Sequence, residues 1–324
     1  MIPTPPTTSR PLKATLLLLF ATVLWGISFP TMKALAEVQA KHLPQSSSWF
    51  YASLSLTVRF GVAALIVGVW TLRSVGKVSR PEVLQGLGLG IFGSIGILLQ
   101  MDGLTYTPAS TSAFLTQAYC LWIPLTVAIH ERRWPSRTLM VSCAMVLGGV
   151  AVLSQFRWRD LHLGRGEWET LLASLFFTGQ IIWLNRKEFS GNRSQHTTLV
   201  MFASTAAALL PIVFISANHL ADIGRAMHSK PAILLTMVLT VFCTLGAYSL
   251  MNHWQPYIST TRAGLIYCAE PVFTSAFALF LPGWFSNLAG IEYADERMTS
   301  RLLLGGALIT AANILILIRA AQEG

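Results

Sequence analysis

Ten long runs of apolar residues divide this chain of 324 residues, and short polar gaps separate them. A helix needs about twenty apolar residues to cross the roughly 30 Å hydrocarbon core of a bilayer. Because lipid offers no partner to an open sheet edge, such runs predict an all-α integral membrane protein with ten transmembrane helices. The runs cover residues 12–32, 49–72, 83–104, 109–130, 138–155, 168–185, 197–217, 231–252, 263–282 and 301–318.

The charge content agrees with a membrane location. Only 11% of the residues are charged and 53% are hydrophobic, whereas a soluble domain has about 25% charged residues. The net charge of +9 comes from basic residues in the gaps between apolar runs, where membrane topology accounts for them. We therefore expect the lipid bilayer as a partner and no nucleic acid.

One segment of the chain occurs twice. Residues 106–115 read YTPASTSAFL and residues 257–266 read YISTTRAGLI, and a Glu-Arg pair follows each apolar helix, at Glu131-Arg132 and Glu296-Arg297. Five apolar runs fall in each half, so like halves must cross the membrane in opposite directions. This predicts two inverted five-helix repeats, at residues 12–155 and 168–319, joined by a linker at 156–167.

The distribution of basic residues orients the helices. Thirteen of the 23 Lys and Arg lie on the side of the two termini, nine lie on the other side, and Arg59 lies within a run. Basic residues favour the cytoplasmic side. We expect cytoplasmic N- and C-termini, in a membrane of the bacterial cytoplasmic (inner) type.

The ordered motifs of the chain resemble those of the EamA family of the drug/metabolite transporter superfamily. The resemblance extends over nearly the whole chain and is carried by Trp25-Gly26 with Phe29, Arg59, residues 106–115, Pro124, Glu131-Arg132, residues 257–266, Glu270-Pro271 and Glu296-Arg297. It implies transport of small metabolites, with export of amino acids or related compounds as the commoner activity.

Two features depart from the family pattern. Pro124 stands about one turn later in its helix than Pro271 does in the matching helix, so we expect the two helices not to be geometrically equivalent. A longer insert, PGWFSNLAGIEYAD at residues 282–295, precedes Glu296. We expect this insert to form a cap at the membrane surface.

Two ionisable residues within the apolar runs are candidate functional groups. Glu270 suits a proton-coupling site or a cation partner, because a carboxylate inside a membrane helix is costly and marks a substrate or ion path; its other role would be to brace the break at Pro271. Arg59 could bind a substrate carboxylate, but we favour a structural role in which it pins a neighbouring helix.

Aromatic and amide side chains in the helices complete a candidate cavity. Tyr267 stands three residues before Glu270, so a shared helix face would bring a ring beside a carboxylate, an arrangement that suits a cation. Each aromatic alone is better explained by ordinary packing. The predicted substrate-binding set is Trp25, Gln100, Tyr119, Trp122, Gln180, Tyr248, Tyr267 and Glu270, with Glu270 also the predicted ion-coupling residue.

Two further patterns point to structure. The glycines from Gly86 to Gly96 predict a face that packs closely against other helices. Asp102 ends its apolar run, so we expect it to cap a hairpin near the outer surface.

The sequence favours a secondary transporter with a small-molecule substrate, working by alternating access. It contains no Walker A, HExxH or GxSxG motif, and its four cysteines form no CxxC pair, so we expect no catalytic residue, no cofactor and no metal. The alternatives are proton-coupled uptake or exchange of an organic cation, and a scaffold or sensor without transport. Either a monomer or a homodimer is compatible with the sequence.

Overall fold

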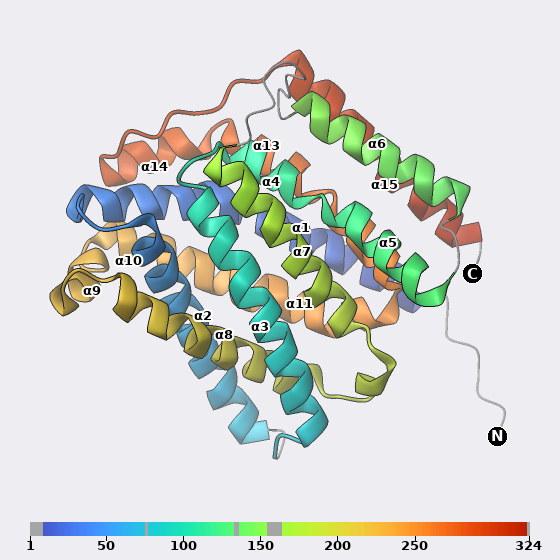
Figure 1. Ribbon diagram of the computed structural model, residues 1–324, viewed down its shortest axis with the longest axis horizontal. Helices are drawn as coiled ribbons and strands as arrows, with labels where there is room; N and C mark the ends of the chain where they lie inside the picture. Colours follow the sequence, from blue (N-terminus) through green and yellow to red (C-terminus); the bar gives the residue numbers. More distant parts are fainter. Residues whose placement is uncertain (1–8, 75–76, 133–135, 154–163, 323–324) are drawn as a thin grey trace.

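The computed structural model describes residues 9–74, 77–132, 136–153 and 164–322, and the regular elements in this part of the chain are all helical (Figure 1). The first half contains α1 (Ser9–His42), α2 (Ser48–Ser74), α3 (Arg80–Gly103), α4 (Ala109–Thr116), α5 (Tyr119–Glu131) and α6 (Arg137–Leu153). The second half contains α7 (Arg165–Leu184), α8 (Ser194–Ser216), α9 (Leu220–Ala226), α10 (Lys230–Val238), α11 (Ala247–Trp254), α12 (Thr260–Tyr267), α13 (Glu270–Ala278), α14 (Leu281–Ala289) and α15 (Ser300–Gln322). Two short 3-10 turns, η1 (Lys187–Phe189) and η3 (Gln255–Tyr257), and a π-helix, η2 (Leu239–Gly246), complete the list. Residues 156–163 of the predicted linker lie outside the described residues.

Six helices of the described chain are long and apolar enough to cross a membrane, which agrees with an integral membrane protein. A seventh is added if the bent unit formed by Thr260–Ala278 and Leu281–Ala289 counts as one span. Two further apolar segments, Met140–Gly149 within α6 and Ser300–Ala312 within α15, are the parts of these helices whose side chains are described without interruption. The arrangement of ten spans in two repeats therefore stays a prediction.

The fourth and ninth predicted helices are both broken, and at matching places. α4 and α5 separate at residues 117–118, and α12 and α13 separate at 268–269. The backbone N–H of Gln117 turns to the Phe114 carbonyl, three residues back, and the Gln117 side chain donates to the Ala113 carbonyl at 3.3 Å instead. From the position of Pro124, we expected the fourth and ninth predicted helices not to be geometrically equivalent. This is wrong for the position of the break, which is the same in both helices, because the Gln117 side chain stabilises the first break without a proline.

The glycines of α3 allow close packing, as predicted. A β-carbon at Gly86 would lie 2.5 Å from Cβ of Val200 on α8, and one at Gly96 would lie 2.9 Å from the Phe177 ring on α7. Both distances are shorter than van der Waals contact. Glycine therefore allows α3 to pack against α7 and α8 at once.

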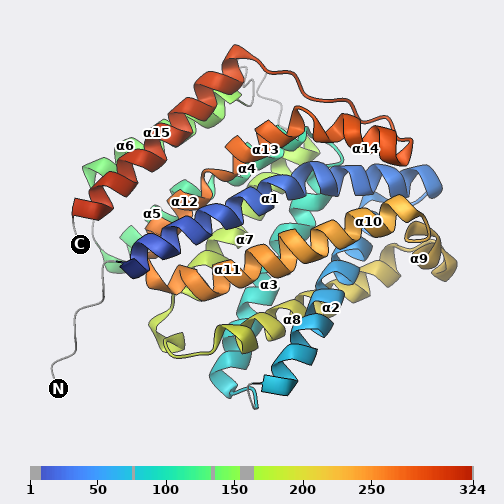
Figure 2. The same cartoon turned by 180° about the vertical axis from the view of Figure 1, so that it is seen from behind.

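The remaining helices pack in pairs around this centre. α2 packs along α8, α6 along α15, and α1 along the continuous unit α10–η2–α11 as well as α13 (Figure 2). The predicted insert is ordered: α14 bends by 53° from the helix before it and lies beside α1. Lys41 of α1 donates to the carbonyl of Gly290 at 2.7 Å, and Glu296 accepts from the Ser110 backbone N–H at the start of α4 at 3.3 Å.

Candidate functional site

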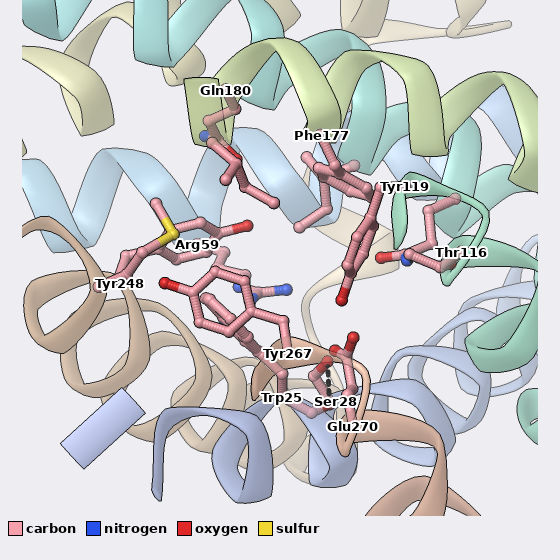
Figure 3. Close-up of a pocket in the computed structure, with 14 residues that line it drawn as sticks. Trp25, Ser28, Arg59, Thr116, Tyr119, Phe177, Gln180, Tyr248, Tyr267 and Glu270 are labelled. Carbon is pink, nitrogen blue, oxygen red and sulfur yellow. Dashed lines mark hydrogen bonds between the residues drawn. The ribbon is translucent and has the colours of Figure 1, made fainter. Parts of the chain in front are cut away.

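A cavity of about 50 Å³ lies among α1, α2, α3, α7, α11 and the broken helices (Figure 3). Every side chain that lines it is buried or half-buried. The structure brings seven of the eight predicted substrate-binding residues to it, namely Trp25, Gln100, Tyr119, Gln180, Tyr248, Tyr267 and Glu270. Arg59 also lines it, together with Ser28, Ile97, Thr116, Phe177, Ile181 and Met251, which the sequence did not single out.

The lining residues follow a regular spacing along the chain. Twelve of the fourteen fall into six pairs whose members stand 151 or 152 positions apart: Trp25 with Phe177, Ser28 with Gln180, Ile97 with Tyr248, Gln100 with Met251, Thr116 with Tyr267, and Tyr119 with Glu270. The duplicated segments, which begin at Tyr106 and Tyr257, stand 151 positions apart as well. Elements from the two halves therefore line the cavity at matching registers.

Glu270 lies at the helix break, where α13 begins. Its side chain is 7% exposed, and the Gln117 side chain donates to Oε2 at 3.4 Å. The hydroxyl of Tyr119 points toward this carboxylate from the opposite wall (Figure 3). The amide oxygen of Gln117 has no hydrogen-bond partner among the described residues. The carboxylate is thus weakly held and keeps capacity for a donor in the cavity.

Arg59 enters the cavity from α2 and is 2% exposed. Its Nε donates to the Thr244 hydroxyl and one terminal nitrogen donates to the Cys243 carbonyl at 3.2 Å, so the π-helix η2 holds it. The other terminal nitrogen has the thioether sulfur of Met32 at 3.5 Å, which is a weak acceptor. Arg59 forms no ion pair with any described residue. It therefore pins η2, as predicted, and also presents an uncompensated charge at the cavity.

Three aromatic side chains form one wall. The Trp25 ring lies 5.4 Å from that of Tyr248 and 5.3 Å from that of Tyr267, both edge to face. The Tyr267 hydroxyl donates to Gln255 at 2.8 Å, whereas the indole N–H of Trp25 has no acceptor in the described part of the chain. The wall offers an apolar aromatic surface and one free donor.

The two predicted glutamines are each engaged by one hydrogen bond. Gln100 donates to the Thr116 hydroxyl at 3.0 Å, and Gln180 donates to the Leu89 carbonyl at 3.1 Å. Their amide oxygens remain as acceptors beside the cavity. Both side chains are thus oriented by the protein before any ligand enters.

Two expectations about single residues are wrong. Trp122 does not line the cavity; its indole N–H donates to Ser174 at 3.1 Å, because α5 turns this ring toward α7. Tyr267 and Glu270 do not share one helix face, since the chain breaks between them, although both reach the cavity.

Asp102 was expected near a solvated surface, and it is fully buried instead. Its carboxylate binds Arg165 of α7 at 2.6 Å. Helix α7 covers it by packing along α3, a contact that the local sequence does not contain.

Comparison with known proteins agrees with the fold and with the motifs. Residues 12–155 match the model of the EamA-like transporter family. A protein of Archaeoglobus fulgidus named an uncharacterized transporter is 23% identical over 309 residues, which is 95% of this chain and 87% of that relative. A solved crystal structure, 16% identical, superposes with a TM-score of 0.61 over 94% of this chain and 98% of that one, so the two share a fold. The first half of the chain is therefore similar to the EamA-like transporter family, as the motifs predicted, and the match and the relative together support a membrane transporter.

Proposed function

We propose that the protein is a secondary transporter of a small zwitterionic metabolite, an amino acid or a related compound, which it exports by alternating access. One observation carries this proposal: the cavity is lined by one buried guanidinium, Arg59, and one buried carboxylate, Glu270. Arg59 would bind the substrate carboxylate and Glu270 the ammonium group, since each charge pairs with its opposite at low local dielectric. The direction of transport follows the family resemblance.

The aromatic wall supports a substrate with a modest apolar side chain. Trp25, Tyr248 and Tyr267 supply an apolar aromatic surface, and most small-molecule sites combine such a surface with a few polar groups to obtain affinity and orientation. The predicted binding set, apart from Trp122, would thus act as one site.

The paired lining supports two inverted five-helix repeats with the substrate site between them. Six residue pairs at an offset of 151 or 152 would be related by a two-fold axis through the cavity. The packing is paired in the same way, because α7 packs along α3 as α1 packs along α10–η2–α11. With α4–α5 and α12–α14 each counted as one span, and with α6, α7 and α15 included, the helices make ten.

A second candidate is proton-coupled uptake or exchange of an organic cation, with Glu270 carrying the proton. The aromatic rings of Trp25, Tyr248 and Tyr267 on the same cavity favour it, since rings attract cations. Arg59 argues against it, because an unpaired guanidinium at the same cavity repels a ligand without a negative group.

Counterflow into liposomes tests the proposal. Protein reconstituted with unlabelled amino acid inside should accumulate labelled amino acid from outside, and a quaternary amine without a carboxylate should give a small signal. Accumulation of the amine alone would support the second candidate. No flux of any zwitterion or cation would contradict both and favour a scaffold or sensor.

The orientation of the chain in the membrane can be tested by cysteine labelling. The four native cysteines are buried, so the background is low, and Ser190 and Glu292 are exposed on loops separated by three predicted spans. We expect a membrane-impermeant maleimide to label Glu292→Cys on intact cells and Ser190→Cys only after permeabilisation. The reverse pattern would invert the orientation. Labelling of both on intact cells would exclude an odd number of spans between them.

A further inference from the structure

A second buried charge cluster lies outside the cavity, where α3 ends beside the start of α7 (Figure 1). Arg165 binds two carboxylates there: its Nη2 lies 2.6 Å from Oδ2 of Asp102, and its Nε lies 2.7 Å from Oε1 of Glu169. The Asp102 side chain is 0% exposed and that of Glu169 is 12% exposed, while Arg165 is 45% exposed. Two negative charges thus face one positive charge in a site that water reaches mainly through Arg165.

The geometry of the guanidinium brings the two carboxylates together. Nε and Nη2 form one edge of the group, an edge that a single carboxylate normally occupies with both of its oxygens. Here Asp102 and Glu169 take one nitrogen each. The remaining nitrogen, Nη1, donates to the Tyr106 hydroxyl at 2.7 Å, and the guanidinium carbon lies 4.5 Å from the Tyr106 ring centre. Arg165 therefore holds the two acids on the same edge of its guanidinium, with one nitrogen for each.

Each acid also has a second oxygen without a partner. Oδ1 of Asp102 and Oε2 of Glu169 are both buried and accept no hydrogen bond from any described residue. A buried, unpaired carboxylate oxygen is strongly destabilising, and two like charges in contact cannot both stay ionised at low cost.

Among the described residues, no second cation forms an ion pair with Asp102 or Glu169. Lys33 of α1 donates to the backbone carbonyl of Thr107 at 2.8 Å, and Glu167 accepts from the Thr107 hydroxyl at 2.9 Å. Helix α4, which packs on this part of α7, has no ionisable residue. No hydrogen bond joins Tyr106, Glu167 or Lys33 to Asp102 or Glu169 in the described part of the chain.

We propose that Asp102 and Glu169 bind one proton between them, at a site separate from the substrate cavity. The proton comes from solvent and forms an O–H bond to one carboxylate, which donates a hydrogen bond to the unpaired oxygen of the other. The cluster with Arg165 is then neutral, and both unpaired oxygens are satisfied.

The bound proton also fastens α7 to α3. Of the residues that line the cavity, α7 carries Phe177 and Gln180, and α3 carries Ile97 and Gln100. Loss of the proton leaves two negative charges on one guanidinium and weakens the contact between the helices. The site therefore couples solvent pH to the separation of two cavity walls, independently of Glu270.

Infrared spectroscopy of the purified, full-length protein tests the proposal without any transport assay. The measurement uses the Glu270→Gln background, so that Glu270 contributes no carboxylic-acid signal. We expect a carboxylic-acid C=O band at neutral pH that shifts in D₂O. The band should be lost in both Glu169→Gln and Asp102→Asn. It should be unchanged in the control Glu188→Gln, because Glu188 is an exposed carboxylate bound to Arg186. A band that survives both substitutions, or no band at neutral pH, overturns the proposal.

A stability measurement keeps the test valid if Asp102→Asn does not fold. A proton held only by the folded protein stabilises it at low pH, and this contribution is lost as the pH rises through proton release. The melting temperature of the Glu270→Gln protein should fall across that range, whereas that of the same protein carrying Glu169→Gln should stay flat, because the new amide donates permanently to Asp102. Parallel pH profiles of the two proteins would contradict the proposal.

Discussion

Replacing Glu270 by glutamine should reduce amino-acid counterflow by roughly ten- to a hundredfold, with little loss of protein stability. A hydrogen bond to a charged group contributes about 1.5–3 kcal/mol, and every 1.4 kcal/mol or so changes an equilibrium tenfold. The carboxylate accepts only one long bond, from Gln117 at 3.4 Å, so the fold depends little on its charge. Glutamine keeps its shape and removes its attraction for an ammonium group.

A pair of substrates makes the prediction specific. The deaminated analogue of the amino acid lacks the ammonium group. It should therefore compete poorly with the labelled amino acid for the wild-type protein. For Glu270→Gln, it should compete as well as the unlabelled amino acid does. The matched control is Glu188→Gln, the same chemical change at an exposed ion pair with Arg186, which should leave counterflow unchanged. If Glu270→Gln still prefers the amino acid to its deaminated analogue, Glu270 is not the ammonium partner. If the variant loses only the response to a pH gradient, proton coupling is its role.

The sequence was sufficient to predict most members of the cavity. Polar and aromatic residues within apolar helices are costly unless they face the interior, and this reasoning selected Trp25, Tyr248 and Glu270 among others. The six lining residues that it missed are smaller, apolar or aromatic, such as Ser28 and Ile97. Five of them are repeat partners of residues already selected or of one another, so an offset of 151 or 152 would have identified them.

Other features depend on contacts that no local pattern contains. Asp102 is buried because α7 packs over it, and Trp122 leaves the cavity because Ser174 of α7 accepts its N–H. The break at residues 117–118 contains no proline and is stabilised by the Gln117 side chain, which the sequence alone does not distinguish from any other glutamine. The first two features depend on tertiary contacts between segments about fifty residues or more apart in the sequence. The third depends on one side chain that takes the place of a backbone donor at the helix break.

Arg59→Met should abolish amino-acid counterflow, by a hundredfold or more, while the melting temperature stays at or above that of the wild-type protein. The physical reason is that Arg59 is a fully buried cation without an ion-pair partner among the described residues. Removing such a charge and filling its volume with an apolar side chain is often neutral or stabilising, because the desolvation cost disappears. Residues kept for function are commonly those that cost stability. Thr244 also retains a hydrogen bond to the Leu239 carbonyl at 3.0 Å, so η2 is not left without support.

Two further variants separate the binding role of Arg59 from its structural one. Arg59→Lys keeps the charge but loses the parallel donors of the guanidinium, so it should retain weak transport. Thr244→Val removes only one of the partners that hold the guanidinium, so it should reduce transport less than Arg59→Met does. The amide analogue of the substrate, which lacks the carboxylate, should bind Arg59→Met at least as well as the wild-type protein, since the substitution removes the repulsion between the guanidinium and the ammonium group. If Arg59→Met has a lower melting temperature and still prefers the substrate with the free carboxylate, Arg59 only pins η2. The proposed zwitterionic substrate would then be wrong, and the substrate would be one that Glu270 binds without Arg59.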